Sequence, residues 1–144
     1  MAAKDKIHEA VKNALIKDGW TITADPLPIE FEELHLFADL EAEQTLEAAR
    51  QGQVIAVEIK SFLSRSAVHD LYLALGQYDV YRAFLEGAGK QHRLYIAVGE
   101  AAYLRFFALR SVQFLIERYA LPLVVIDIDR EEIVKWINSP ITMN

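Results

Sequence analysis

The 144-residue chain contains no cysteine, which excludes disulfide bonds and metal sites built from thiolates. This absence fits a reducing cytosol, so we expect a cytoplasmic protein. No apolar run approaches the roughly 18 residues that a membrane-spanning helix needs. The first residues, Met1 to Lys6, run directly into a charged helical pattern, so we expect no signal peptide. The four histidines are scattered, without the spacing of a zinc site.

The chain also lacks an excess of positive charge, because its net charge is −6 at pH 7. This counts against strong non-specific binding to nucleic acid, which depends on Lys and Arg neutralising phosphates. It does not exclude a small enzyme whose acidic site is neutralised by metal ions, or a subunit that relies on a partner to hold DNA. Five cations could contact phosphates or could simply be scattered over the surface: Lys90, Arg93, Arg105, Arg110 and Arg118.

Hydrophobic residues make up 53% of the chain, which is enough for a full core. No repeat, low-complexity segment or linker interrupts the sequence, so we expect a single domain over residues 1–144. Its core should span about residues 4–138, and a loose C-terminal tail should follow Ser139 and Pro140.

Hydrophobic periodicity predicts the order αβββαβαβα. We expect a helix over 4–18, strands over 20–23, 29–31 and 34–41, and a helix or loop over 42–51. These are followed by a strand over 55–62, a helix from Ser64 or Ser66 to Glu86, a strand over 92–98, a helical stretch over 100–119 with a break near Leu109, a strand over 121–128 and a short helix over 130–137. Adjacent early strands favour an antiparallel meander, and strands separated by helices favour parallel pairing. The predicted fold is therefore mixed α/β, with a mixed central sheet flanked by helices.

The strand over residues 55–62 carries two charged side chains on one face. Side chains alternate along a strand, so Glu58 and Lys60 lie with Ala56, opposite the branched residues at 55, 57 and 59. Charges are seldom buried without partners or a task. A metal-dependent nuclease uses this Glu-x-Lys pattern, with the Glu holding a divalent cation and the Lys orienting or activating the attacking water. The alternative is an ion pair on the wet face of a half-exposed strand, because the motif is short and common.

Asp39 is a second acid of interest. It lies on the opposite face of its predicted strand from Leu36, Ala38 and Leu40. If this strand pairs with the 54–61 strand in a meander, Asp39 and Glu58 share a sheet face. Two converging carboxylates suit Mg²⁺, because hard cations take oxygen ligands and keep several waters. The alternative is an exposed acid near the end of a strand.

Gln77 and Tyr81 lie four residues apart in a predicted helix and therefore share a face. Gln77 interrupts an apolar stripe, and burying an unpaired amide costs about 1–3 kcal/mol. We therefore expect Gln77 to contact a polar group on the sheet below, most naturally in the active site; the alternative is a residue at the core edge bonded to the backbone. Glu9, near the apolar stripe of the first helix, is a further candidate, and the alternative for it is a solvated helix position.

Asp39, Glu58-x-Lys60 and Gln77-x-x-x-Tyr81 together resemble the PD-(D/E)XK nuclease superfamily, including the Gln-x-x-x-Tyr motif of its RecB-like branches. Four stretches are also similar to the XisH family of cyanobacterial proteins: Lys17 to Thr23, Asp39 to Glu43, Ile55 to Phe62 and Ala74 to Tyr78. The resemblance covers roughly residues 4–138. Family members are named as controlling factors for excision of the fdxN element, a DNA segment removed during heterocyst differentiation. They act alongside a site-specific recombinase and a second small protein, XisI.

The resemblance implies a restriction-endonuclease-like core with a metal site. Asp39 and Glu58 would be ligands of Mg²⁺ or Mn²⁺, and Lys60 would be the catalytic base or the residue that orients the water. The motif departs from the superfamily pattern in one respect, because Ala38 stands where a Pro often precedes the Asp.

The same resemblance gives roles to three residues on helices. Gln77, a catalytic-site residue, and Tyr81 would support the site or contact DNA, and Glu9 corresponds weakly to the first-helix acid that some branches use. DNA, XisI and a recombinase are the implied partners, and no membrane is implied.

Two functional hypotheses remain. The first is a Mg²⁺-dependent endonuclease or nuclease-like DNA-processing factor, which the intact site residues favour. The second is a catalytically silent nuclease-fold accessory protein that controls recombination by binding protein or DNA, which the acidic charge balance favours. A homodimer is a further expectation, because a core of this size has limited room for the aromatic residues Tyr72, Tyr78, Phe106, Phe107 and Phe114.

Overall fold

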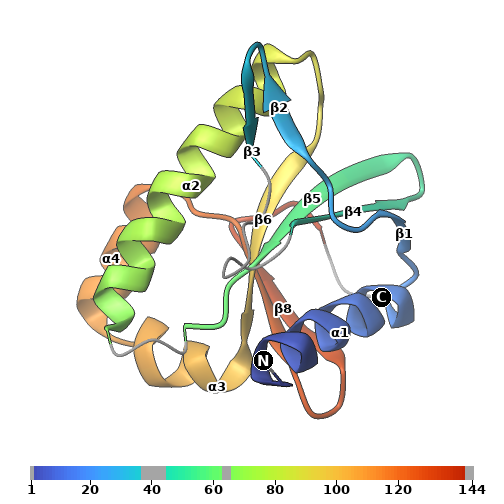
Figure 1. Ribbon diagram of the computed structural model, residues 1–144. Coiled ribbons are helices and arrows are strands. Elements are labelled where there is room, and N and C mark those ends of the chain that lie inside the picture. Colours follow the sequence, from blue (N-terminus) through green and yellow to red (C-terminus); the bar gives the residue numbers. More distant parts are fainter. Residues whose placement is uncertain (1, 37–44, 63–65, 142–144) are drawn as a thin grey trace.

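A six-stranded mixed sheet forms the centre of the computed structural model, which describes residues 2–36, 45–62 and 66–141 (Figure 1). Its strands, in spatial order, are β1 (Thr21–Ala24), β4 (Thr45–Arg50), β5 (Gln53–Ile59), β6 (Arg93–Gly99), β7 (Leu123–Asp127) and β8 (Glu132–Ile137). The three central strands β5, β6 and β7 are parallel, and the flanking strands pair antiparallel. The predicted mixed α/β sheet flanked by helices is confirmed.

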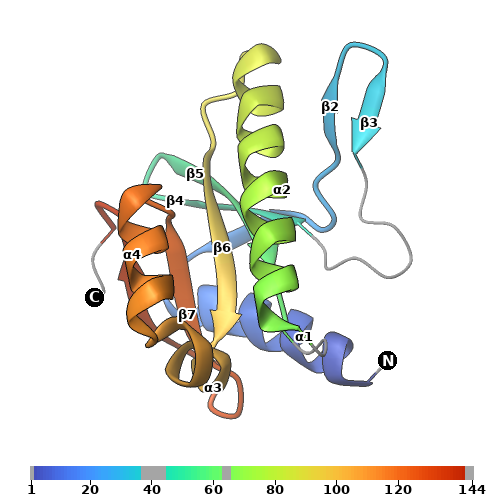
Figure 2. The same ribbon diagram turned by 90° about the vertical axis from the view of Figure 1, so that its left-hand side faces the viewer.

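Helices cover both faces of this sheet (Figure 1). Helix α1 (Ala2–Lys17) packs on one face. The other face carries α2 (Ala67–Gly87), α3 (Glu100–Ala102), the π-helical turn η1 (Tyr103–Phe107) and α4 (Arg110–Arg118). Figure 2 shows α2 and α4 side by side in front of the sheet. Among the residues that the structure describes, no helix combines the length and apolar character needed to cross a membrane.

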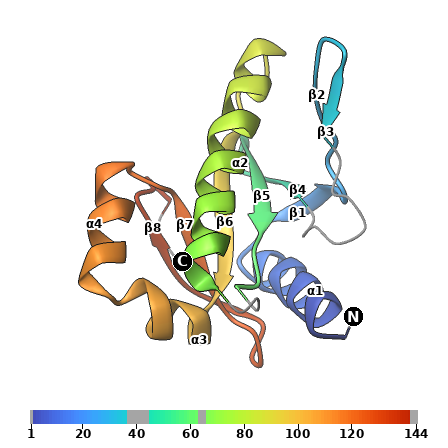
Figure 3. The same cartoon turned by 60° about the vertical axis from the view of Figure 1, so that its left-hand side comes forward.

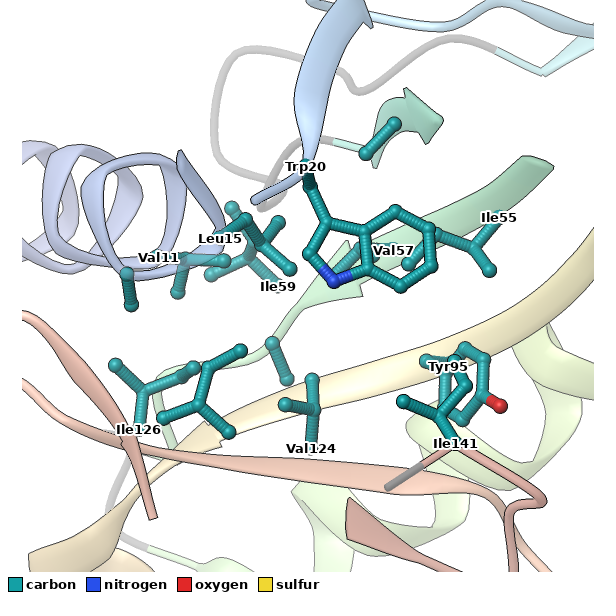
Figure 4. Close-up of a cluster of buried hydrophobic side chains, with 14 residues drawn as sticks. Val11, Leu15, Trp20, Ile55, Val57, Ile59, Tyr95, Val124, Ile126 and Ile141 are labelled. Atoms are coloured by element: carbon teal, nitrogen blue, oxygen red, sulfur yellow. The ribbon is translucent and has the colours of Figure 1, made fainter. Parts of the chain in front are cut away.

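Each face of the sheet has its own hydrophobic core. The first core lies under α1 (Figure 4) and includes Val11, Leu15, Trp20, Ile55, Val57, Ile59, Tyr95, Val124, Ile126 and Ile141. The second core lies under α2 and α4 and includes Phe62, Leu71, Ala74, Ile96, Val98, Phe106, Phe107, Val112, Ile116 and Leu123. The tail was predicted to be loose after Pro140, but Ile141 is buried in the first core.

The prediction of a helix or loop over 42–51 is wrong for its described part, because residues 45–50 form strand β4. The helix-forming side chains in this stretch suggested a helix. Tertiary pairing with β5 outweighs that propensity, and the turn between the two strands fixes the pairing. Gln51 and Gly52 both adopt left-handed backbone conformations, with φ of 50° and 81°. This is the geometry of a two-residue hairpin turn whose twist matches the strands that it connects.

The predicted short helix over 130–137 is also wrong, because residues 132–137 form strand β8, an antiparallel partner of β7. The prediction placed the start of a helix directly after Asp129. Instead, the backbone N–H of Arg130 donates to the Asp127 carboxylate at 3.0 Å, and Glu131 has a left-handed φ of 55°, so the chain turns back. Ile133 and Trp136 then pack on the first core, as suits branched and aromatic residues in a strand.

The expected meander between the 34–41 strand and the 54–61 strand is not found in the described residues. Strand β3 (Leu34–Leu36) pairs instead with β2 (Ile29–Phe31) in a separate two-stranded sheet, which stands apart from the main sheet in Figure 3. A two-residue turn at Glu32 and Glu33 joins the two strands, so they pair with their neighbour along the chain. Strand β5 takes β4 as its antiparallel neighbour. The rest of the predicted strand, including Asp39, lies outside the described residues.

The helices on the second core begin and end near the predicted positions. The Ser66 hydroxyl caps α2 by accepting a hydrogen bond from the His69 backbone N–H at 3.1 Å. The helical stretch over 100–119 is interrupted at Leu109, whose backbone is extended (φ −66°, ψ 139°). The break predicted near Leu109 is therefore confirmed.

Candidate functional site

Strand β5 separates apolar and charged side chains as its alternation predicts. Ile55, Val57 and Ile59 face the first core, so Glu58 and Lys60 point to the face covered by α2. The Glu58 side chain is only 1% exposed and that of Lys60 11% exposed. The Lys60 backbone N–H donates to the Ala97 carbonyl at 2.9 Å, which extends the pairing with β6 beyond the end of β5. Both charged groups are therefore inside the fold and not on a wet strand face.

Three predicted site residues meet between β5 and α2. The Lys60 Nζ atom lies 3.4 Å from Glu58 Oε2 and donates a hydrogen bond to Gln77 Oε1. Gln77 thus has the polar target on the sheet that the pattern of its helix predicted. The contact joins the middle of α2 to the end of β5. We call Glu58, Lys60 and Gln77 the Glu–Lys–Gln cluster.

Tyr81 lies one helical turn after Gln77 and flanks this cluster. It packs against a small apolar group formed by Ala56, Leu85 and Leu94. Ala56 precedes Glu58 by two positions on the same strand face, so Tyr81 covers the strand next to the cluster.

Two other predicted site residues are not part of the described cluster. The Glu9 side chain is exposed on α1, which packs on the opposite face of the sheet from α2. Asp39 lies outside the described residues. The chain re-enters the described structure at Thr45, whose Cα pairs directly with that of Glu58.

The segment that follows Lys60 has a strained backbone that the sequence did not reveal. Phe62 has a left-handed φ of 54°, which is a genuine outlier for a bulky side chain. Its ring is held by an edge-to-face contact with Phe107 at a centroid distance of 5.0 Å, and it also contacts Phe106. Both partners belong to η1, and π-helical turns are frequent at functional sites. Packing against η1 therefore fixes the chain two residues after Lys60.

Asp70 is a further acid on the inner side of α2 that sequence reasoning missed. It lies seven residues before Gln77, and hence two turns away on the same helix face. Its Oδ2 atom is buried and has no hydrogen-bond partner among the described residues. An acid in the first turn of a helix is ordinary, because it complements the helix dipole, so its sequence position gave no functional signal.

The Glu–Lys–Gln cluster can hold a cation and donate hydrogen bonds, but it does not contain a complete metal site. Within residues 2–36, 45–62 and 66–141, no group of three or more His, Asp or Glu side chains is arranged to hold a metal ion. Glu58 supplies one buried carboxylate of the kind that Mg²⁺ prefers. Lys60 supplies an ammonium group with three donors, which suits a water or a phosphate oxygen.

The aromatic residues considered for an interface divide between core and surface. Phe106 and Phe107 are buried in the second core, and Tyr78 is partly buried. Burial raises the pKa of the Tyr78 hydroxyl, partly opposed by the charges of Arg82 and Arg93. Tyr72 and Phe114, by contrast, are 65% and 66% exposed on α2 and α4. Only these two of the five remain available for contact with another molecule.

Known proteins match this chain along nearly its whole length. The family model described as "XisH protein" matches residues 1–134. A crystal structure of an fdxN element excision controlling factor protein from Anabaena variabilis is 41% identical in sequence, with a TM-score of 0.83; the match covers 92% of this chain and 98% of that one. A crystal structure of an XisH family protein from Nostoc punctiforme is 38% identical, with a TM-score of 0.83 and coverage of 92% and 99%. No curated protein gives a significant match.

The family match spans the stretches singled out by sequence and runs from α1 into the first half of β8. The chain belongs to the XisH family.

Proposed function

We propose that this chain is a Mg²⁺-dependent, nuclease-like DNA-processing factor with a restriction-endonuclease-like core. The observation that carries the proposal is the buried Glu–Lys–Gln cluster on one sheet face. In keeping with the name of its Anabaena variabilis relative, we propose that it supports site-specific excision of a DNA element of the fdxN type.

Burial of the cluster supports a functional role over a structural one. Removing a Lys and a Glu from water costs several kcal/mol per ion, and apolar residues of similar size are often neutral or stabilising replacements for a buried ion pair. The neighbouring positions on β5 are small or branched apolar residues, so apolar side chains could also have filled the positions of Glu58 and Lys60. Retaining two charges and an amide here suits a site that acts on a charged substrate.

Asp39 is the proposed second acidic ligand. It precedes Thr45 by six positions, and Thr45 pairs with Glu58 across the sheet. A segment of that length spans at most about 20 Å when fully extended, so the chain connection allows Asp39 to approach Glu58.

The chemical types of the side chains at this site suit a hard divalent cation. One buried carboxylate comes from Glu58, no thiolate is available, and Mg²⁺ is usually bound through one or two carboxylates together with waters and substrate phosphates. A bound Mg²⁺ would supply Lewis-acid chemistry, lowering the pKa of a water and neutralising charge on a phosphate.

Lys60 would act directly on the reacting groups. Glu58 and Gln77 approach its ammonium group from two directions and thereby fix it in place. Because Lys carries three N–H donors, one remains to orient a water or to stabilise developing charge on a phosphate oxygen. Gln77 is in this scheme a positioning residue, and Tyr81 closes the flank of the site.

The test is DNA cleavage by the purified chain in the presence of Mg²⁺ or Mn²⁺. We expect cleavage by the wild type and a loss of at least a hundredfold in Glu58→Gln and Lys60→Met. The matched controls are Glu86→Gln and Lys135→Met, which change exposed residues away from the cluster and should cleave normally. Equal cleavage by all five proteins would rule out the mechanism.

A catalytically silent accessory role is the second candidate. The net charge of −6 and the exposed rings of Tyr72 and Phe114 favour contact with proteins over bare DNA. A recombinase and XisI are then the proposed partners, and a second copy of this chain is another. Calorimetry with Mn²⁺ separates the two candidates. Heat of binding that disappears in Asp39→Asn and Glu58→Gln supports the enzyme, and no binding by the wild type supports the accessory role.

A further inference from the structure

Helix α2 has a second uncharged side that faces away from the sheet. Its inner side, which includes Leu71, Ala74 and Leu85, packs on the sheet. Figure 3 shows the helix in the outer layer of the molecule, in front of β6. Along its outer side runs a row of residues spaced alternately by four and three positions. This row, which we call the outer seam, consists of His69, Leu73, Gly76, Val80, Ala83 and Gly87.

Every residue of the outer seam is exposed. Leu73 is 48% and Val80 45% exposed, and the seam contains no Lys, Arg, Asp or Glu. A surface helix normally presents charged and polar side chains to water on the side opposite its core. An uncharged row with this spacing is instead typical of a helix that packs against another helix. The charged residues of α2 all lie outside the seam: Asp70, Asp79, Arg82 and Glu86.

Nothing within the described chain requires a glycine at position 76. A glycine inside a helix costs about 1 kcal/mol relative to alanine. Where the Cβ of a larger residue would lie, no heavy atom is found within 4 Å, and the backbone of Gly76 is not left-handed. The close approach of another molecule would explain the missing side chain, because small residues allow two helices to pack near the lower end of the usual interaxial distance of about 8–10 Å.

A second, antiparallel copy of α2 complements the outer seam. In one two-fold symmetric register, each larger side chain of one copy faces a smaller one of the other, and symmetry repeats each pair in the reverse sense. Such alternation of large and small side chains allows facing layers to interdigitate. The facing pairs are Val80 with Gly76, Leu73 with Ala83 and His69 with Gly87.

The polar side chains beside the outer seam also suit this register. Tyr72, which is 65% exposed, comes close to the level of Glu86 of the second copy, so its hydroxyl can donate to that carboxylate. Asp79 and Arg82 form an ion pair at 3.0 Å within one helix and lie near the two-fold axis. Across the axis, the two Arg82 side chains offset the two Asp79 charges, so the flank of the seam is electrostatically complementary to itself.

The size of the contact predicts reversible association. A helix of 21 residues is about 31 Å long and about 10 Å across. One side of it therefore covers less than the roughly 800 Å² that each partner contributes to a standard interface. A dimer of this kind forms as the concentration rises, and the free chain remains folded.

We propose that two copies of this chain associate through their outer seams, antiparallel and around a two-fold axis, with Val80 of each copy seated over Gly76 of the other. The interface uses no residue of the Glu–Lys–Gln cluster and needs neither metal nor DNA.

The test is sedimentation equilibrium of the full chain, in metal-free buffer without DNA, from micromolar to near-millimolar concentration. We expect the wild type to pass from the monomer mass to the dimer mass. Gly76→Val should raise the dissociation constant of the dimer at least tenfold, because two branched side chains then meet in one layer. Adding Val80→Ala restores a large–small layer in the reverse order and should recover most of the lost affinity. The matched control, Ser111→Val, adds a branched side chain at an exposed position of α4 and should dimerise as the wild type does.

Gly76→Val should leave the monomer intact, because the Cβ that it adds meets no atom within 4 Å. Its thermal unfolding, measured at a dilution where the chain is monomeric, should match or exceed that of the wild type. Three outcomes would overturn the proposal. They are a wild type that stays monomeric throughout, which would leave the outer seam to a different protein, a Gly76→Val variant that dimerises normally, and a double variant that recovers no affinity. The result does not depend on whether the chain cleaves DNA.

Discussion

The ammonium group of Lys60 donates a hydrogen bond to the side-chain carbonyl oxygen of Gln77, 17 residues further along the chain. This contact crosses from the end of β5 to the middle of α2. It connects the Glu-x-Lys motif on the sheet with the Gln-x-x-x-Tyr motif on the helix, which the sequence presented as separate patterns.

Replacing Gln77 with Leu should lower the free energy of unfolding by about 1–3 kcal/mol, because Lys60 loses a buried acceptor. Adding Lys60→Met to this variant should recover part of the loss, since neither polar partner is then left alone. Urea denaturation of the two single variants and the double variant gives the coupling energy, expected at about 0.5–3 kcal/mol. Glu86→Leu, at an exposed position of the same helix, should change stability by less than about 0.5 kcal/mol. Additive single effects would contradict the contact.

Two glycines should respond to alanine in opposite directions. Gly52 has a φ of +81° in the β4–β5 turn, so Gly52→Ala should destabilise the fold by about 1–2 kcal/mol through left-handed strain. Gly76 lies within α2, where an added Cβ meets nothing within 4 Å, so Gly76→Ala should stabilise it by about 0.5–1 kcal/mol. Urea denaturation of both variants checks the pair. Stabilisation by Gly52→Ala would argue against the hairpin turn.

Burial tends to raise the pKa of the Glu47 carboxyl, but hydrogen bonds from His92 and Thr23 lower it overall. The stability of the fold should therefore fall in acid. A carboxyl with a lower pKa in the folded chain stabilises it above the ordinary value of 4.5, and this contribution is lost as the pH falls through the folded-state pKa. Unfolding free energies measured between about pH 5 and pH 3 should therefore fall less steeply in Glu47→Gln than in the wild type. The exposed Glu132→Gln should follow the wild-type curve. Parallel curves for all three proteins would show that the Glu47 contacts are not formed in solution.

Tyr72 and Phe114 should matter for association and little for folding. Both rings are mostly exposed, so Tyr72→Ser and Phe114→Ser should each change the unfolding free energy by less than about 0.5 kcal/mol. If a homodimer forms through α2 or α4, the matching substitution should shift light scattering towards the monomer mass. A wild-type chain that stays monomeric over the whole concentration range would remove this expectation.

Periodicity predicted the elements whose side chains face one core. The alternation from Ile55 to Lys60 placed Glu58 and Lys60 on the same face, and the stripe through Gln77 predicted a polar partner below it. These predictions succeeded because burial of a single face produces a regular apolar periodicity in the sequence.

Strands β4 and β8 were missed because their pairing depends on turns and neighbours. Residues 45–50 have helical propensity, and the Gln51–Gly52 turn outweighs it only once β5 is available as a partner. Residues 132–137 become a strand because β7 offers a free edge. Tertiary contacts of this kind override local propensity and cannot be read from one segment alone.

The contact between His92 and Glu47 was equally hidden from sequence reasoning. The interaction of His92 with Glu47 crosses 45 positions, and no spacing rule connects two such residues.

The parallel centre of the sheet has a consequence for how the chain reaches its native state. The hairpins β4–β5 and β7–β8 join neighbours along the chain, and hairpins of this type form in about 1–10 μs. Strands β5 and β6 can align only after α2 has crossed over between them, which adds loop-closure entropy to their pairing. Docking of the two hairpins onto β6 should therefore be the slow step of folding, whereas Lys60 and Gln77, only 17 positions apart on consecutive elements, can meet before it.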